Sequence, residues 1–149
     1  MSNIKARAAA LMASPEDAEA QFYEALREGD LERVMALWAD DEEIVCVHPG
    51  GTRLVGSRAI RAAFETVFAN GTVAVQPEHV KRVQSMGTAV HSVLERVQVM
   101  TNEGPQAAWV VATNVYVKTA LGWRMVAHHA SPGSVGEVQE VGETPAVLH

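Results

Sequence analysis

Two adjacent histidines, His128 and His129, close a strand-like stretch and are the first residues whose types suggest a functional site. The stretch is GWRMVAHHASP, residues 122–132, and alternate residues of an extended chain point to opposite faces. Trp123, Met125 and His129 therefore share the predicted core face, and His128 falls on the outer face. Because the two imidazoles point apart, they cannot bind one metal ion without a bulge in the strand, and we predict no metal site.

His48 lies in a His-Pro-Gly-Gly turn after a short apolar run and is the strongest candidate for a catalytic group. An imidazole has an ordinary pKa of about 6.5, so it can act as a general base at cellular pH. Asn114 and Tyr116 carry groups that could stabilise an oxyanion or enolate. The alternative is that His48 only caps its turn and that His129 only bonds a backbone carbonyl.

The remaining reactive side chains give weaker signals. Cys46 is the only cysteine and lies in an apolar run, which indicates a buried structural thiol and a reducing compartment. The acidic run 40–43 is more typical of a solvated loop than of paired catalytic carboxylates. Neither Cys46 nor Ser131 has the neighbours of an activated nucleophile. The chemistry that the sequence favours is proton transfer without a cofactor.

Length and composition indicate one ordinary globular domain. The chain has 149 residues, 48% hydrophobic and 20% charged, with a formal net charge of -6. An acidic chain without a Lys/Arg-rich run is a poor match for nucleic acid, and no stretch reaches the roughly 20 apolar residues of a membrane span. We expect a cytoplasmic protein with neither partner. Its domain should cover residues 14–132, between an N-terminal extension over 1–13 and a flexible tail over 133–149.

Helix signals come first along the chain. A Ser-Pro pair at Ser14 begins a helix that Gly29 ends, and Asp30 caps a second, shorter helix. Ser57 caps a third helix, which stops at the Asn-Gly pair 70–71. Apolar residues at helical spacing give each helix one face that needs a sheet or another helix to cover it.

Strand signals dominate the second half of the chain. After short extended runs at 44–47 and 52–55, β-rich segments at 72–85, 88–101 and 106–118 lead to the final strand at 122–132. Turn residues separate successive segments, which favours an antiparallel meander. Helices followed by a run of strands are typical of an α+β fold in which a curved sheet wraps the helices.

The last turn sets which residues should face the interior. If the hairpin turns about Ala120, Asn114 lies opposite Ala127, on the predicted core face. A similar count across the preceding turn adds His91 and Glu95 to that face. A shift of the register by one residue would move both outside.

Several stretches, in this order, resemble one family. They are the Gly29-Asp30 junction, Ala39-Asp40-Asp41 before the first strand, the turn from Pro49 to Gly56 before a helix, and the closing Gly122-Trp123-Arg124-Met125-Val126. Over residues 16–132 the chain resembles the SnoaL-like, ketosteroid-isomerase-like branch of the nuclear transport factor two (NTF2-like) superfamily. It is also similar to the association domain of the calmodulin-dependent kinases, an assembly module rather than an enzyme.

The resemblance implies a cone-shaped, cystatin-like or NTF2-like α+β barrel, with three N-terminal helices packed in a curved, mainly antiparallel sheet. It also implies a pocket between the helices and the concave sheet, and a homodimer formed through the sheet. The catalytic residues of ketosteroid isomerase are replaced here. Its base aspartate corresponds to His48, its oxyanion acid to Asn114, and its helix tyrosine to Phe22, with Tyr23 adjacent on a different face. Steroid isomerisation is therefore disfavoured.

Three functions follow from these observations. The leading one is a protein that binds a small apolar molecule with one polar end in its pocket. The second is a cofactor-free isomerase, cyclase or dehydratase with His48 as base and Asn114 as a second catalytic group, and the third is a non-catalytic assembly module. The predicted pocket residues are Phe22, Trp38, Phe64, Tyr116, Met125 and His129, joined by His91 and Glu95 if the strand register holds.

Overall fold

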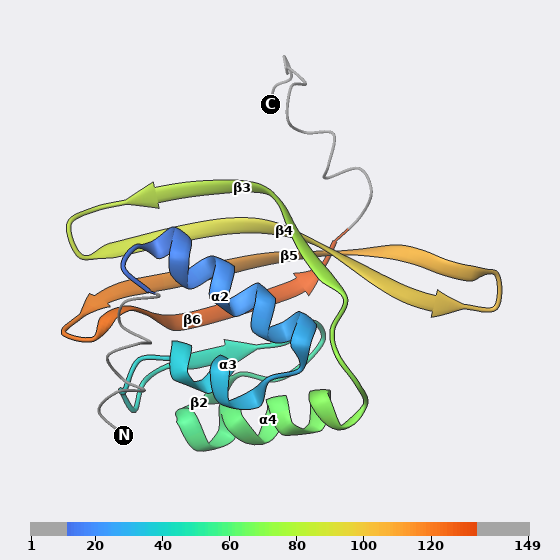
Figure 1. The fold of residues 1–149 in the computed structure, drawn as a ribbon, viewed down its shortest axis with the longest axis horizontal. Helices are drawn as coiled ribbons and strands as arrows, with labels where there is room; N and C mark the ends of the chain where they lie inside the picture. Colours follow the sequence, from blue (N-terminus) through green and yellow to red (C-terminus); the bar gives the residue numbers. More distant parts are fainter. Residues whose placement is uncertain (1–11, 134–149) are drawn as a thin grey trace, which may run out of the picture.

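The structure, a computed structural model, describes residues 12–133, in which helices lie across one side of a curved six-stranded sheet (Figure 1). The described elements are α2 (Pro15–Glu28), α3 (Leu31–Leu37), β1 (Val45–Val47), β2 (Leu54–Val55), α4 (Ser57–Ala69), β3 (Val75–Gln84), β4 (Thr88–Thr101), β5 (Gly104–Thr119) and β6 (Gly122–Pro132). The strand order is β2-β1-β6-β5-β4-β3, and β1 and β6 are its parallel pair. The predicted α+β architecture is confirmed.

Local capping explains where the first helices begin and end. Ser14 accepts a hydrogen bond from the backbone N–H of Asp17 at 3.0 Å, and Asp30 accepts one from the N–H of Arg33 at 3.1 Å. Gly29, between the two helices, has a φ of 65°, a conformation that strains residues with a Cβ. The chain therefore turns sharply from α2 into α3, as predicted.

Some element boundaries differ from the prediction. Ser57 is the first residue of α4 rather than its cap, and Gly56 occupies the cap position without a side-chain bond. The strand expected from residue 72 begins at Val75. The strand expected from residue 106 begins two residues earlier, at Gly104, because the β4–β5 hairpin turns through only residues 102–103.

A β-bulge in β6 decides which of its side chains face the helices. Val115 pairs with Ala127, but the next residue of β5, Tyr116, pairs with Met125. Val126 is therefore an extra residue without a partner across the strand. Side chains beyond the bulge lie on the opposite faces from those that strict alternation predicts.

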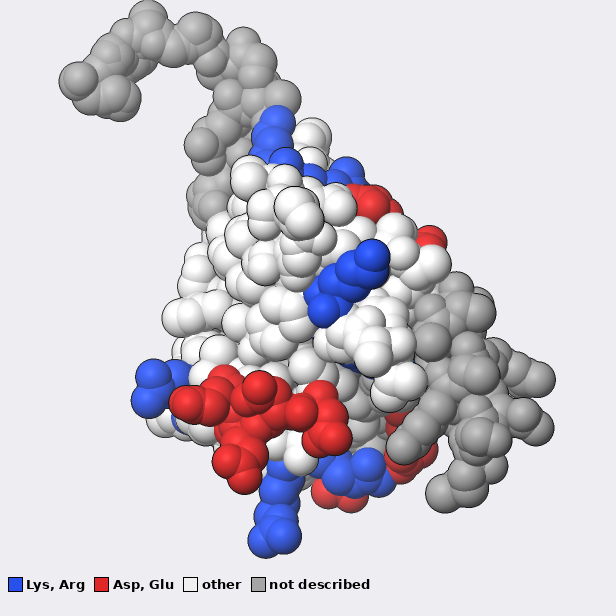
Figure 2. Space-filling view, turned by 90° about the vertical axis from the view of Figure 1, so that its left-hand side faces the viewer, with Lys and Arg blue, Asp and Glu red and all other residues white. Residues whose placement is uncertain are grey.

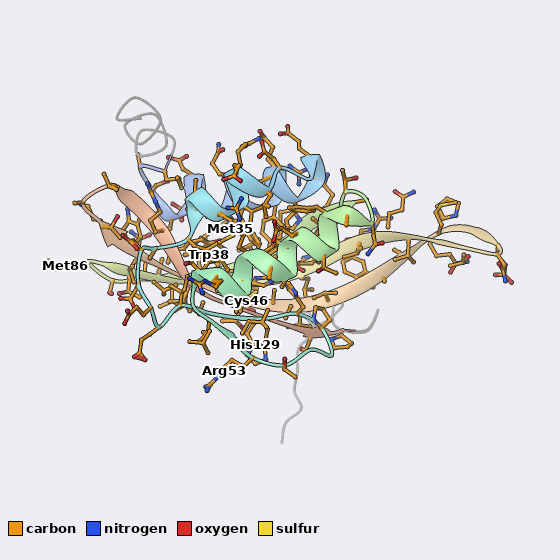
Figure 3. The ribbon with its side chains drawn as sticks, turned by 90° about the horizontal axis from the view of Figure 1, so that it is seen from below. Met35, Trp38, Cys46, Arg53, Met86 and His129 are labelled. Carbon is orange, nitrogen blue, oxygen red and sulfur yellow. The ribbon has the colours of Figure 1, made fainter. Side chains whose placement is uncertain are left out.

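The bulge reverses the predicted orientation of the histidine pair. His128 is buried on the inner face opposite Asn114, whereas His129 is exposed on the outer face. Figure 3 shows His129 on the side of the sheet away from the helices, together with Arg53. The predictions that His129 faces the interior, that His128 faces outward and that Asn114 lies opposite Ala127 were wrong. They assumed a period of two along the whole strand, which a bulge breaks.

The hydrophobic core lies between the helices and the inner face of the sheet. On α2, Phe22 and Tyr23 are both buried and pack edge to face, with ring centroids 5.1 Å apart. Trp38, at the end of α3, forms a parallel bridge with Met125 of β6 and so closes the end of the core near the β5–β6 turn. No helix among residues 12–133 is long and apolar enough to cross a membrane.

Candidate functional site

A cavity of about 380 Å³ lies between α2, α4 and the inner face of strands β4, β5 and β6. Most of its wall is apolar, including Phe22, Leu26, Phe64, Val97, Val110 and Ala130. Protein interiors rarely leave empty space much larger than a water molecule. A hollow of this size next to a well-packed core is therefore a candidate ligand site.

Three ionisable side chains interrupt the apolar wall of the cavity. Glu95 comes from β4, His128 from β6, and His48 from the turn that follows β1. Pro49, next to His48, also lines the cavity and fixes the turn that presents the imidazole. Because the three groups come from distant parts of the chain, only the folded sheet brings them to one space.

A chain of three hydrogen bonds runs from His128 to Glu95. His128 Nδ1 lies 2.5 Å from Asn114 Oδ1, Asn114 Nδ2 donates to the Tyr23 hydroxyl at 3.0 Å, and that hydroxyl donates to Glu95 Oε2 at 2.6 Å. All four residues are buried, with at most 7% of their surface exposed. The network therefore joins α2 to three strands inside the protein.

These hydrogen bonds have one direction when Glu95 is ionised. A carboxylate can only accept hydrogen bonds, so the Tyr23 hydroxyl donates its hydrogen to Glu95. The hydroxyl oxygen of Tyr23 in turn accepts a hydrogen bond from the amide NH₂ of Asn114. The amide oxygen of Asn114 then faces His128 and accepts the hydrogen on Nδ1. His128 is thereby held as the tautomer whose Nε2 is an acceptor.

Burial shifts the ionisable groups of the cavity toward their neutral forms. Loss of water raises the pKa of Glu95 to about 7, and the hydrogen bond from Tyr23 offsets only part of the rise. Burial lowers the pKa of His128 to about 3, with smaller contributions from His48 and His129, and it also lowers the pKa of His48. Near neutral pH both imidazoles are uncharged, so Glu95 is the group of the wall that can carry a charge.

His48 is held in the wall by contacts on two sides. Its ring packs edge to face on Phe64 with centroids 5.0 Å apart, and 6.3 Å separates it from the ring of His128. Its Nε2 lies 3.5 Å from the sulfur of Cys46. Burial raises the pKa of the Cys46 thiol to about 12, so the sulfur keeps its hydrogen. Cys46 is thus a support for His48 rather than a nucleophile.

A second polar cluster lies under the start of α2, outside the cavity wall. His91 Nδ1 is 2.9 Å from Glu19 Oε1, and Arg82 donates to the same carboxylate oxygen at 3.2 Å. The His91 ring packs edge to face on Tyr116, with centroids 5.0 Å apart. The cluster ties α2 to β3 and β4. Among residues 12–133, no group of three or more His, Cys, Asp or Glu side chains is arranged to hold a metal ion.

The structure separates the predicted pocket residues into two groups. The residues that line the cavity are Phe22, His48, Phe64 and Glu95. Trp38, Tyr116 and Met125 are not in its wall and pack in the hydrophobic core instead. They lie nearer the β5–β6 turn, where Trp38 at the end of α3 bridges to Met125 of β6.

Two further predicted residues are on the inner face but behind the cavity wall. Asn114 and His91 are both fully buried, and they pair with each other across β4 and β5. Asn114 reaches the cavity only through His128 and Tyr23, so its place is to position these side chains. A catalytic role for Asn114 or His48 stays a prediction.

Sequence reasoning missed His128 and Tyr23. No local feature of GWRMVAHHASP signals the bulge that turns His128 inward. Tyr23 follows Phe22 on α2, and the two side chains point in different directions around a helix. The available signal was Glu95, because a carboxyl on a buried strand face needs a hydrogen-bond donor, and a helical tyrosine facing the sheet supplies one.

An α+β cone with an apolar cavity between its helices and sheet defines an NTF2-like, cystatin-like fold, and the comparisons with known proteins agree. Residues 16–134 match the family model of the SnoaL-like domain. This chain belongs to the SnoaL-like family, within the NTF2-like superfamily. No curated protein matches the chain.

Solved structures similar to this chain include kinase association domains and a protein described as a dehydratase. One, from Thiobacillus denitrificans, is described as a calcium/calmodulin-dependent protein kinase type II association domain; it is 35% identical, with a TM-score of 0.75 over 83% of this chain and 98% of that one. An NTF2-like protein from Streptomyces avermitilis, described as a dehydratase, is 29% identical, with a TM-score of 0.70 over 78% and 91% of the two chains. The CaMKII hub of S. rosetta, 22% identical with a TM-score of 0.65 over 81% and 98%, shares the fold.

Proposed function

We propose that the protein binds a small, mainly apolar molecule with one polar end in the cavity between α2, α4 and the sheet. The observation that carries the proposal is the cavity of about 380 Å³, whose apolar wall contains Glu95, His48 and His128. Ligand pockets typically have volumes of roughly 300–1,000 Å³ and combine apolar walls with a few polar groups. A ligand of modest size fits this description.

The energetic cost of the polar groups supports the same proposal. A carboxyl group in an apolar wall loses its hydration, and Tyr23 is its hydrogen-bond partner among the described residues. A glutamine or an apolar residue at position 95 would avoid that cost. Groups whose protonation equilibria are shifted by burial in a hollow are typical of binding and catalytic sites.

The binding proposal predicts different results for two neighbouring alanines of β5. Ala108 lines the cavity, whereas Ala107 is exposed on the opposite face of the strand. Ala108→Phe should weaken binding of cyclohexylmethanol at least about tenfold, because the added ring occupies space that the ligand needs. Ala107→Phe should bind the alcohol as the wild type does. Ligand-observed NMR titration measures both affinities, and equal binding by both variants would show that this cavity is not the site.

A second candidate function is self-association through the outer face of the sheet. Val83 and Val90 form a cross-strand pair on β3 and β4 and are 72% and 37% exposed. Met86 and Leu121, in the hairpin turns at the same end, are also exposed. Figure 2 views this end of the molecule and shows a broad surface with few charged side chains above an acidic cluster. The similarity to the association domain of Thiobacillus denitrificans supports self-association of the chain. The exposed apolar side chains at this end lead us to propose a homodimer through this face.

Charge substitutions on β4 test the proposed dimer. Val90→Glu would bury a carboxylate between two sheets and should weaken dimerisation at least about tenfold. Met100→Glu is a control on the same strand, because Met100 is 75% exposed at the opposite end, next to the β4–β5 turn. Sedimentation equilibrium of the wild type and both variants measures the effect. A monomeric wild type at micromolar concentration would exclude this proposal and leave the binding proposal intact.

A further inference from the structure

We propose that the polar end of the molecule bound in this cavity is a protonated amine that pairs with Glu95. The inference rests on the proposed binding function and names the chemical class of the ligand. It depends on two properties of the wall, the direction of its hydrogen bonds and the balance of its charges.

The direction of the hydrogen bonds leaves acceptors facing the cavity. The Tyr23 hydroxyl donates to Glu95, and Asn114, which does not line the cavity, donates one hydrogen of its amide to Tyr23. His128 uses its Nδ1 hydrogen on Asn114, which leaves Nε2 as an acceptor. Glu95 has its second carboxylate oxygen, Oε1, without a partner among the described residues. A ligand group that donates hydrogen bonds, rather than one that accepts them, is complementary to this end of the wall.

The charges of the cavity are also unbalanced in favour of a cation. No lysine or arginine of the described residues lines the cavity. The nearby Arg27 donates to the backbone oxygen of Val75, and Arg82 pairs with Glu19 and Glu16. When Glu95 is ionised, the cavity therefore holds one carboxylate with no counter-ion. A bound ammonium group would supply both the missing charge and the missing hydrogen bonds.

The ionisable groups around Glu95 are all uncharged near neutral pH. The ionisable neighbours are Tyr23 from α2, Tyr116 from β5, His128 from β6 and His48 from the turn after β1, while Pro77, opposite on β3, and Val110, opposite on β5, carry no charge. Burial raises the pKa of both tyrosines and lowers that of both histidines. All four are uncharged near neutral pH, so the ionisation of Glu95 controls the charge of the site.

Binding of an amine should therefore depend on pH through Glu95. The pKa of this carboxyl is about 7 in the free protein, and an aliphatic amine stays protonated up to a pH of roughly 10. Amine affinity should rise as the pH increases from 5.5 to 8, because the carboxylate forms over this range. An uncharged ligand of the same shape lacks this dependence on the carboxylate.

Three probes with one apolar ring and different polar ends test the inference: cyclohexylmethylamine, cyclohexylmethanol and cyclohexanecarboxylate. By NMR titration at pH 8, the amine should bind the wild type at least about tenfold more tightly than the alcohol, and the carboxylate should bind least well. Between pH 8 and pH 5.5, the preference for the amine should fall about tenfold or more.

Two charge-neutralising variants locate the effect. In Glu95→Gln, the amine should lose its advantage over the alcohol and its dependence on pH. Glu103→Gln removes the same charge from the exposed β4–β5 turn and should leave both affinities as in the wild type. Circular dichroism checks that each variant is folded, and the pH series on the wild type tests the inference without any substitution.

The outcomes separate this inference from the function on which it rests. Binding of the alcohol at pH 8 as tightly as the amine, or tighter binding of the carboxylate, would overturn the amine assignment and keep the binding function. An amine preference that persists in Glu95→Gln would overturn it as well. If none of the three probes binds to the wild type, both proposals fail.

Discussion

The substitution His128→Gln is expected to change the free energy of unfolding more favourably at pH 4 than at pH 7. The change at pH 4 should exceed the change at pH 7 by about 3 kcal/mol. Burial holds the pKa of His128 at about 3 in the folded protein, whereas an unfolded histidine has a pKa of about 6.5. Between these two pH values, His128 binds a proton in the unfolded chain but not in the folded protein. Stability from this residue is therefore full above pH 6.5 and is lost as the pH falls toward 3.

Glutamine suits this test because its side-chain NH₂ can still donate to Asn114 and leave the hydrogen-bond chain closed. Urea unfolding at several pH values gives the free energy of unfolding of the variant and of the wild type. The effects of the other residues cancel in the difference between the two. His129→Gln is the matched control, since its imidazole is exposed on the outer face, and its difference from the wild type should not change with pH in this way. The same pH dependence in His128→Gln and the wild type would mean that His128 is not buried as the structure places it.

Replacing Glu95 by glutamine is expected to stabilise the protein at pH 8 by about 3 kcal/mol and to have little effect near pH 4.5. The folded pKa of about 7 lies above the ordinary value of 4.5. Between pH 4.5 and 7 the unfolded chain loses its proton while the folded protein keeps it, so stability falls as the pH rises through this window. A glutamine avoids the cost of a buried carboxylate and can still accept the hydrogen bond from Tyr23.

Urea unfolding of Glu95→Gln at pH 4.5 and pH 8 measures this gain, with Glu103→Gln as the control that removes an exposed carboxylate. Lower stability of Glu95→Gln at pH 8 would contradict the prediction and would indicate that the carboxylate has a charged partner. Because a stabilising loss of a charged group is typical of functional sites, the expected result would also support a role for Glu95 in binding.

The two buried groups act in opposite directions over nearly the same range of pH. As the pH rises from 4.5 to 6.5, His128 adds stability and Glu95 removes it, at similar rates. Their contributions should largely cancel in the wild type, and each substitution should uncover the effect of the other group. A site can thus hold two groups with strongly displaced pKa values whose joint contribution to stability changes little between pH 4.5 and 6.5.

The sequence alone predicted the order of the elements because their signals are local. Ser14, Gly29 and Asp30 mark helix ends through side-chain caps and a left-handed backbone, and both effects act within a few residues. The change from helical to alternating apolar spacing predicted the α+β fold, and the shared stretches indicated the family. His48 lies in the cavity wall beside Pro49, whose turn fixes its position relative to the first strand.

The composition of the site was decided by the tertiary structure. One extra residue in β6, Val126, exchanges the faces of His128 and His129, and it appears only in the pairing of β6 with β5. The contact between Tyr23 and Glu95 joins residues 72 positions apart and exists only because α2 crosses the sheet at β4. Burial, which gives Glu95 and His128 their displaced pKa values, is likewise a property of the packed molecule. The sequence by itself determined the elements and the family, whereas the packing of distant strands and helices determined which side chains meet in the cavity and in what ionisation state.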